Sequence, residues 1–154
     1  MTTSEFNYQL YPLGETEKYR PMIKTRIGYN GALSGFQAIV DSGSDWTISF
    51  VEIGEALGIN FDSDLLKEEM ESRGLKFKDK VEGITGNCEV YTVPANLAFN
   101  DKEATIVVRW LRTKFDPKKD FPLILGQDSI FGFYDIHFSR RQKKFFLNSE
   151  ILSK

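Results

Sequence analysis

The clearest chemical feature of this sequence is a carboxylate placed directly after an apolar run. Residues 36–40, FQAIV, are short, rich in aliphatic side chains and close to glycines on both sides, which is typical of a buried β-strand. Asp41, Ser42 and Gly43 follow and predict a tight turn, because Ser42 can hydrogen-bond locally and Gly43 lets another backbone approach closely. The pattern therefore delivers the Asp41 carboxylate from a core strand into a turn. On its own, Asp-Ser-Gly also fits an ordinary turn without chemistry.

Two further segments follow this turn along the chain. Residues 83–86, Gly-Ile-Thr-Gly, predict the glycine-rich tip of a hairpin, which by itself is an ordinary turn. Residues 123–126, Leu-Ile-Leu-Gly, predict an apolar strand that ends in glycine. This last segment would support a site without supplying a reactive group.

Together, these segments resemble the motifs of the retroviral-type (retropepsin-like) aspartic proteases: Asp-Ser/Thr-Gly, a glycine-rich flap tip, and a hydrophobic-hydrophobic-glycine segment in the second half. The resemblance covers about residues 21–147. It implies a mostly β, retropepsin-like acid protease fold, with a closed or partly open β-barrel-like half, short helices and one domain per chain. We expect residues 21–150 to form that domain and residues 1–20 to be an N-terminal arm or tail.

The resemblance also implies roles for individual residues. Asp41 would be catalytic, Ser42 and Gly43 would support the active site, and Asp45 would lie beside the substrate backbone. The flap residues would be Gly83, Ile84, Thr85 and Gly86, and the second-half segment would supply Ile124, Leu125 and Gly126. Viral enzymes often place Arg after that last glycine, whereas this chain has Gln127, which removes a possible ion pair with Asp45.

The chain contains a single Asp-Ser/Thr-Gly motif, because Asp128-Ser129-Ile130 lacks the glycine. Hydrolysis in this class needs two carboxylates that face one water, so the resemblance implies a symmetric homodimer that brings two Asp41 side chains together. The implied function is a homodimeric aspartic endopeptidase that cleaves an extended peptide or protein substrate, with no cofactor and no metal. Two alternatives stay open: a non-catalytic peptide-binding or dimerisation module with the same fold, and a processing protease of narrow specificity.

Composition limits the kinds of partner and site that we expect for this chain. A chain of 154 residues predicts one domain, and a net charge of −2 gives no electrostatic argument for nucleic acid or an anionic membrane as partner. The sequence has no apolar run of membrane-spanning length and no signal-peptide core, so we expect a soluble, cytoplasmic protein. Cys88 is the only cysteine, which excludes an internal disulfide. Trp46 and Trp110 are expected to be core or dimer-interface anchors.

Hydrophobic periodicity and turn signals predict the elements that would position these residues. Asn30-Gly31 predicts a hairpin between a strand at 22–29 and the strand before Asp41. Apolar spacing predicts a helix face from Ile48 to Leu57, and a second helix over 62–73. The later expectations are a hairpin around 83–86, a separate hairpin over 96–110, a charged loop at 111–120, a strand at 121–125, a short helix near 127–132, and a last hairpin over 133–147.

Overall fold

The computed structural model of the chain describes residues 2–13, 16–83, 86–100 and 102–149. Strands dominate this part of the chain, and the three helices are short. The elements are β1 (Thr2–Asn7), β2 (Gln9–Leu13), β3 (Thr16–Arg20), β4 (Met22–Gly28), β5 (Leu33–Val40), β6 (Ile48–Phe50), α1 (Val51–Ala56), α2 (Asp64–Ser72), β7 (Lys78–Gly83), β8 (Gly86–Phe99), β9 (Lys102–Arg112), β10 (Leu123–Leu125), α3 (Ile130–Phe133), β11 (Asp135–Ser139) and β12 (Lys144–Ser149).

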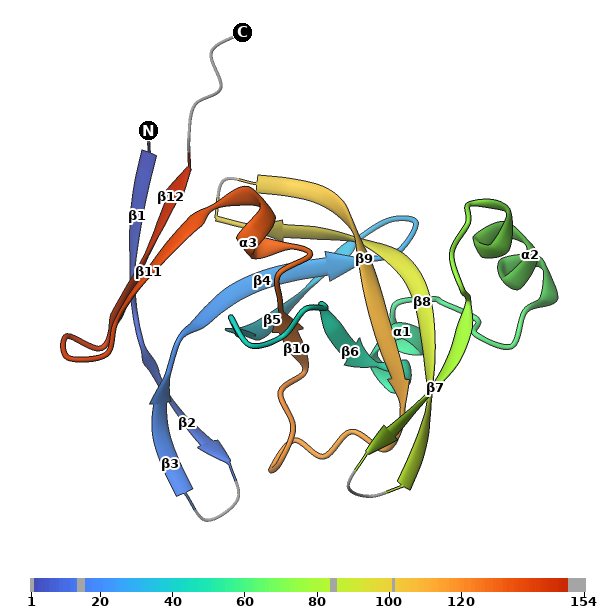
Figure 1. The fold of residues 1–154 in the computed structure, drawn as a ribbon, viewed down its shortest axis with the longest axis horizontal. Coiled ribbons are helices and arrows are strands. Elements are labelled where there is room, and N and C mark those ends of the chain that lie inside the picture. The colour runs from blue at the N-terminus through green and yellow to red at the C-terminus, as the bar shows by residue number, and fades with distance from the viewer. Residues whose placement is uncertain (1, 14–15, 84–85, 101, 150–154) are drawn as a thin grey trace, which may run out of the picture.

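Six strands close a barrel in the order β4-β5-β10-β6-β9-β8, because β8 also pairs with β4 (Figure 1). The pairs β5–β10 and β6–β9 are parallel, and the other pairs of the ring are antiparallel. β7 pairs with β8 and extends the sheet beyond the ring. The predicted fold class, mostly β with a closed barrel and short helices, is confirmed.

The interior of the barrel is formed by alternate residues of its strands, as the two-residue period of a strand requires. Trp110 on β9 is completely buried, which confirms the expectation that it anchors the core. Its indole N–H donates to the Val93 carbonyl at 2.9 Å, so the one polar group of the ring is satisfied inside the core. Phe61, which lies between α1 and α2 in the chain, packs against Trp110 with the two ring centroids 5.8 Å apart.

The three predicted helices are present, but each is shorter than predicted or shifted, and the largest difference is at the start of the first. Ile48 belongs to β6 rather than to the helix, because it pairs with Ile124 of β10 and Arg109 of β9. α1 therefore begins at Val51, and the chain leaves it through Gly58, whose φ of +100° is a conformation that glycine adopts easily. Ser63 caps α2 by accepting a hydrogen bond from the Leu66 amide at 3.3 Å. No helix in the described part of the chain is long and apolar enough to cross a membrane.

The second half of the sheet contains one long strand where the sequence predicts two hairpins. β8 runs without interruption from Gly86 to Phe99 and pairs first with β7 and then with β4, while β9 runs along its other edge. Pro94 lies between the last β7 pair, at Tyr91, and the first β4 pair, at Asn96. One edge of β8 is therefore open at Pro94, which is where a strand tolerates proline.

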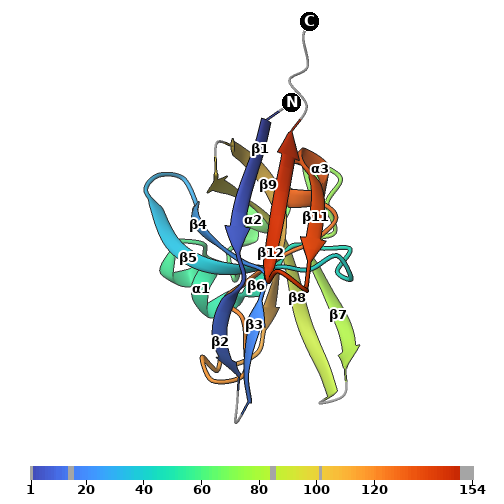
Figure 2. The same ribbon diagram turned by 90° about the vertical axis from the view of Figure 1, so that its left-hand side faces the viewer.

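The N-terminal residues, for which the sequence left an arm or a tail open, form strands. β1 pairs antiparallel with β12 over six residues, from Thr2↔Ser149 to Asn7↔Lys144, and β12 also pairs with β11 (Figure 2). β2 and β3 form a separate ribbon, and Tyr11 of this ribbon contacts Phe121 with ring centroids 5.0 Å apart. β12 is thus paired on both edges within its own chain.

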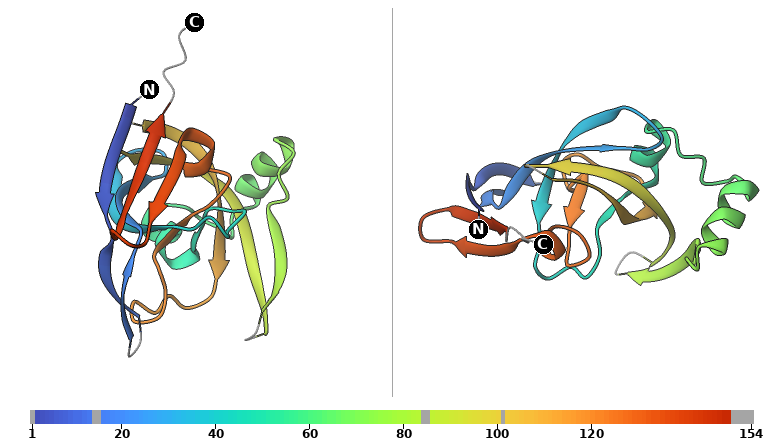
Figure 3. Two further views of the ribbon diagram at one scale, coloured as in Figure 1. Left: turned by 60° about the vertical axis from the view of Figure 1, so that its left-hand side comes forward. Right: turned by 90° about the horizontal axis from the view of Figure 1, so that it is seen from above.

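The β7–β8 hairpin extends beyond the barrel, on the side where α2 also lies (Figure 3). Its two strands pair from Lys78↔Tyr91 to Gly83↔Gly86. The hairpin predicted around residues 83–86 is confirmed up to these two glycines.

Candidate active site

Asp41 lies immediately after β5, at the edge of the barrel where β5 and β10 both end. The two strands are parallel, with Val40 opposite Leu125, and the Asp41 amide donates to the Leu125 carbonyl at 3.0 Å. Because the carboxyl ends of parallel strands meet at one edge of a sheet, Asp41 and Gly126 leave the barrel side by side. The apolar run before Asp41 therefore sets its position from the core outward.

The turn that follows orients the Asp41 carboxylate. The Gly43 amide donates to Asp41 Oδ1 at 2.9 Å, and the Ser44 amide donates to the Asp41 carbonyl at 3.2 Å. This is an Asx-type turn, which holds one carboxylate oxygen and leaves the other for a further partner. Asp41 is half-buried, and no ion pair to it is found in the described part of the chain.

Gly126 allows the two ends of the site to touch. A Cβ on Gly126 would lie 2.5 Å from the Ser44 carbonyl oxygen and closer still to that of Trp46. The same contact brings the Gln127 amide to the Ser44 carbonyl at 2.8 Å. The glycine of the second-half segment is therefore required by close backbone approach.

Gln127 also holds the Asp41 turn through its side chain. Its Nε2 donates to the Ser42 carbonyl at 2.9 Å, across the turn from Asp41. The residue that departs from the viral pattern thus has a local partner in this chain, on the backbone of the turn and not on Asp45.

A buried hydroxyl pair lies behind the turn and has no counterpart in the sequence analysis. Thr47 is fully buried, and its hydroxyl donates to Asp128 Oδ1 at 2.7 Å. Its oxygen also lies 2.5 Å from the hydroxyl of Ser129, which is nearly fully buried. Because the Thr47 proton is used by Asp128, Ser129 supplies the proton of the second bond. This network connects the end of the Asp41 turn to the segment after Gly126.

The other predicted site residues are distributed around this turn. Ser42 and Asp45 are exposed, and Gly43 is exposed as well. Leu125 is fully buried, and Ile124 pairs with Ile48 across β10 and β6. Gly83 and Gly86 face one another at the end of the β7–β8 hairpin, and Ile84 and Thr85 lie outside the described residues.

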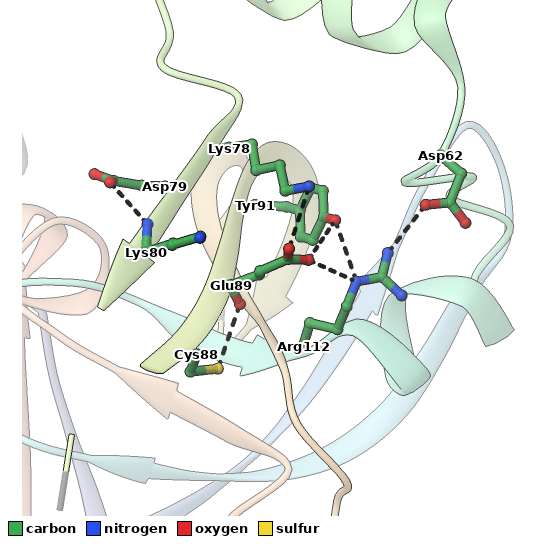
Figure 4. A network of polar contacts seen from close by, with 8 residues as sticks. All are labelled: Asp62, Lys78, Asp79, Lys80, Cys88, Glu89, Tyr91 and Arg112. Carbon is green, nitrogen blue, oxygen red and sulfur yellow. Dashed lines mark hydrogen bonds and ion pairs between the residues drawn. The ribbon is translucent and has the colours of Figure 1, made fainter. Parts of the chain in front are cut away.

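Charged residues join the base of this hairpin to β9 (Figure 4). Glu89 accepts from Lys78 at 3.3 Å and from the Tyr91 hydroxyl at 3.1 Å, and Arg112 lies 3.5 Å from the same carboxylate. Arg112 also reaches Asp62 at 3.3 Å. The hydrogen bond from Lys78 is the main reason why the pKa of Glu89 is lowered, and the same bond raises the pKa of Lys78.

Cys88 and the metal-ligating residue types offer no second reactive centre. Burial raises the pKa of the Cys88 thiol, so it stays protonated and weakly nucleophilic near neutral pH. In the described ranges of the chain, no group of three or more His, Cys, Asp or Glu side chains is arranged to hold a metal ion.

Trp46, expected to be a core or dimer-interface anchor, is not a core residue, and the interface alternative stays a prediction. It is 43% exposed, and the guanidinium carbon of Arg109 lies 3.5 Å from its ring centroid. Sequence spacing gives no signal for this contact, because Arg109 is brought to Trp46 by the pairing of β6 with β9.

This fold, with Asp41 at the end of a barrel strand, is that of the retropepsin-like aspartic proteases. The chain is similar to a retropepsin-like aspartic protease from Rickettsia conorii, with a TM-score of 0.53 and 13% identity over 95% of this chain and 91% of that chain. Similarity also extends to EIAV protease in complex with the inhibitor HBY-793 (TM-score 0.47, 15% identity, 75% of this chain and 88% of that chain). A third structure is the retroviral protease-like domain of Ddi1 from Leishmania major (TM-score 0.47, 15% identity, 78% and 82% covered). No protein-family model and no curated protein matches the sequence.

Proposed function

We propose that the chain is an aspartic endopeptidase that works as a homodimer, with Asp41 of each copy forming the catalytic pair. The observation that supports this most directly is the setting of Asp41: a half-buried carboxylate at the end of a core strand, with one oxygen held by the Gly43 amide at 2.9 Å. It lies within a fold shared with retropepsin-like proteases. Gly126 and Gln127, which follow the neighbouring strand β10, hold the same turn from beside it.

The chemistry follows from two such carboxylates around one water. One carboxylate takes a proton from the water while the water oxygen bonds to the scissile carbonyl carbon, and the protonated partner donates to the carbonyl oxygen. The carboxyl that took the water proton then gives it to the amine nitrogen as the C–N bond breaks. One hydroxyl of the tetrahedral intermediate returns its proton to the other carboxylate as the new carboxylic acid forms, so the pair again holds one proton. Two carboxyls this close share one proton, since like charges oppose double ionisation.

Dimerisation is required because one chain contributes one Asp41. In this chain β12 is paired on both edges, by β1 and β11, so the second copy must dock without adding a strand to β12. The β7–β8 hairpin would cover an extended substrate, which would pair its backbone with the protein and place alternate side chains in pockets.

The first test is cleavage of a diverse peptide library between about pH 4 and 7, a window around carboxylate titration. We expect wild type to cleave and Asp41→Asn to be inactive, because an amide cannot exchange the shared proton. Asp135→Asn is the matched control: it removes an exposed carboxylate on β11 and should leave cleavage unchanged. Equal cleavage by wild type and Asp41→Asn would show that the activity does not come from Asp41.

Mixing the two proteins tests the shared site. When wild type and Asp41→Asn are mixed in equal amounts and exchange freely, about a quarter of the dimers contain two Asp41 side chains. Activity per total protein should therefore fall to about a quarter, whereas a site complete in one chain would retain half. The second result would refute the two-chain mechanism and leave the fold unaffected.

A further inference from the structure

A pocket of about 530 Å³ lies beside the candidate active site. It is lined by Trp46 from the turn after Asp41, by Asp79 of β7 and Val90 of β8 at the base of the hairpin, and by Arg109 of β9. The pocket thus joins the turn after Asp41 to the base of the hairpin, and under the proposed function a substrate would pass between these two segments. One substrate side chain would then enter the pocket.

Arg109 is held in the pocket in a fixed orientation. Its guanidinium carbon lies 3.5 Å from the Trp46 ring centroid, so the planar group is stacked on the indole. Arg109 Nε is buried by this packing and makes no hydrogen bond, and no carboxylate of the described part of the chain forms an ion pair with Arg109. The side chain is thus an oriented cation that makes no close ion pair in that part of the chain, although its charge still acts on the Asp79 carboxylate of the same pocket.

The other charged groups that line the pocket are engaged by neighbours. Asp79 lies 3.3 Å from Lys76 and also accepts from the Lys80 amide at 2.8 Å. Asp128 accepts from the buried Thr47 hydroxyl at 2.7 Å. Lys76 and Asp79 neutralise each other, whereas Asp128 keeps its charge beside that hydroxyl. Arg109 is therefore the cation of the lining that has no ion pair among the described residues.

We propose that this pocket is a subsite for an acidic substrate side chain, and that Arg109 is the residue that selects it. The proposal rests on the proposed function, since it takes the substrate to pass between Asp41 and the β7–β8 hairpin. A carboxylate matches the guanidinium because the two planar groups can form parallel charge-assisted hydrogen bonds. Stacking on Trp46 immobilises Arg109 before binding, so little further side-chain entropy is lost when a ligand arrives.

The test uses a set of blocked octapeptides in which each position in turn carries Glu, Gln or Lys. Cleavage is measured with wild type, and binding is measured by calorimetry with Asp41→Asn, so that recognition is read without catalysis. We expect Glu to be preferred over its isostere Gln by about tenfold at one position, the size of a partly solvated charge-assisted hydrogen bond.

Variants at Arg109 separate selection from a structural role. Arg109→Gln should abolish the preference for Glu, and Arg109→Glu should reverse it toward Lys, which a loss of packing would not do. Arg109→Lys keeps the charge without the planar fork and should retain part of the preference. This variant also keeps the test decisive if the neutral variant does not fold.

Arg112→Gln is the matched control, because Arg112 lies on the same strand but is already engaged by Glu89 and Asp62 (Figure 4). It should leave the preference for Glu unchanged. Cleavage without that preference, or with a preference that survives Arg109→Gln, would overturn the subsite and leave the endopeptidase. Binding of Glu peptides that depends on Arg109, without any cleavage, would keep the subsite and overturn the endopeptidase. Failure to bind or cleave any peptide would overturn both.

Discussion

Gly126→Ala should separate the Asp41 turn from the end of β10. The new Cβ would lie 2.5 Å from the Ser44 carbonyl oxygen, and the obstacle is backbone, which cannot rotate aside as a side chain does. The two segments would have to separate by roughly 1 Å to restore a normal van der Waals distance. That movement would lengthen two backbone hydrogen bonds. One runs from the Gln127 amide to the Ser44 carbonyl at 2.8 Å, and the other from the Asp41 amide to the Leu125 carbonyl at 3.0 Å.

The expected cost is about 1 to 3 kcal/mol for overpacking and about 1 kcal/mol for each of the two backbone bonds. The free energy of unfolding should therefore fall by about 3 to 5 kcal/mol, a large part of the 5 to 15 kcal/mol typical of a domain. For a chain of this size, that corresponds to a melting temperature lower by about 10 °C or more.

Urea unfolding followed by tryptophan fluorescence measures this loss, with both proteins at one concentration because dimerisation adds to apparent stability. Gly132→Ala is the matched control, since nothing lies within 4 Å of the added Cβ there. A Gly126→Ala protein within about 0.5 kcal/mol of wild type, the range of ordinary surface substitutions, would refute the view that backbone contact at Gly126 holds the turn.

The hydroxyl network and the hairpin base give two further predictions. Thr47→Val keeps the shape of a fully buried side chain but leaves Asp128 and Ser129 without their shared partner, so the free energy of unfolding should fall by about 1 to 3 kcal/mol. Glu89 has a pKa lowered from 4.5, mainly by its hydrogen bond from Lys78, so its stabilising effect is complete above that pH and is lost as the pH falls through the lowered pKa. Stability measured from about pH 5 to pH 3 should therefore decline less steeply in Glu89→Gln than in wild type.

Each of these two predictions has its own check. Thr105→Val removes an exposed hydroxyl that bonds Asn96 at 3.0 Å, and it should change stability by no more than about 0.5 kcal/mol. A Thr47→Val protein as stable as Thr105→Val would contradict a structural role for the buried network. For Glu89, parallel acid-unfolding curves of variant and wild type would show that its interaction with Lys78 makes no contribution to folding.

Sequence patterns predicted the parts of the fold that depend on neighbouring residues. The hairpin before Asp41 forms where Asn30-Gly31 places it, with Asn30 at a φ of +51°. The turn at Asp41 is equally local, since Gly43 bonds a carboxylate two residues away. Both the hairpin and the turn could be predicted from sequence, because in each case one short segment contains all the groups involved.

The predicted elements were wrong where pairing with distant strands overrode the conformation that the local sequence favours. Ile48 fits a helical face by spacing, yet it is held in a three-residue strand because β10 and β9 pair with it on both edges. The sequence predicts a separate hairpin over 96–110, yet its first strand is the end of the long strand β8, because β4 pairs with residues 96–99 there. In each case the deciding partner lies far away in sequence, so the local pattern could not reveal it.

The same reasoning explains why Arg109 was not recognised from sequence. Alternation along β9 places it on the face opposite the buried Val108 and Trp110, where an arginine ordinarily extends into solvent. Parallel pairing of β6 with β9 sets Ile48 opposite Arg109, and Trp46, two residues before Ile48, then covers the guanidinium. A charged residue on a solvent face thus becomes an oriented cation only through the closure of the barrel. The closure that fixes Gly126 against the Asp41 turn also fixes Arg109 beside Trp46, so the proposed specificity and the proposed chemistry depend on the same long-range strand pairings.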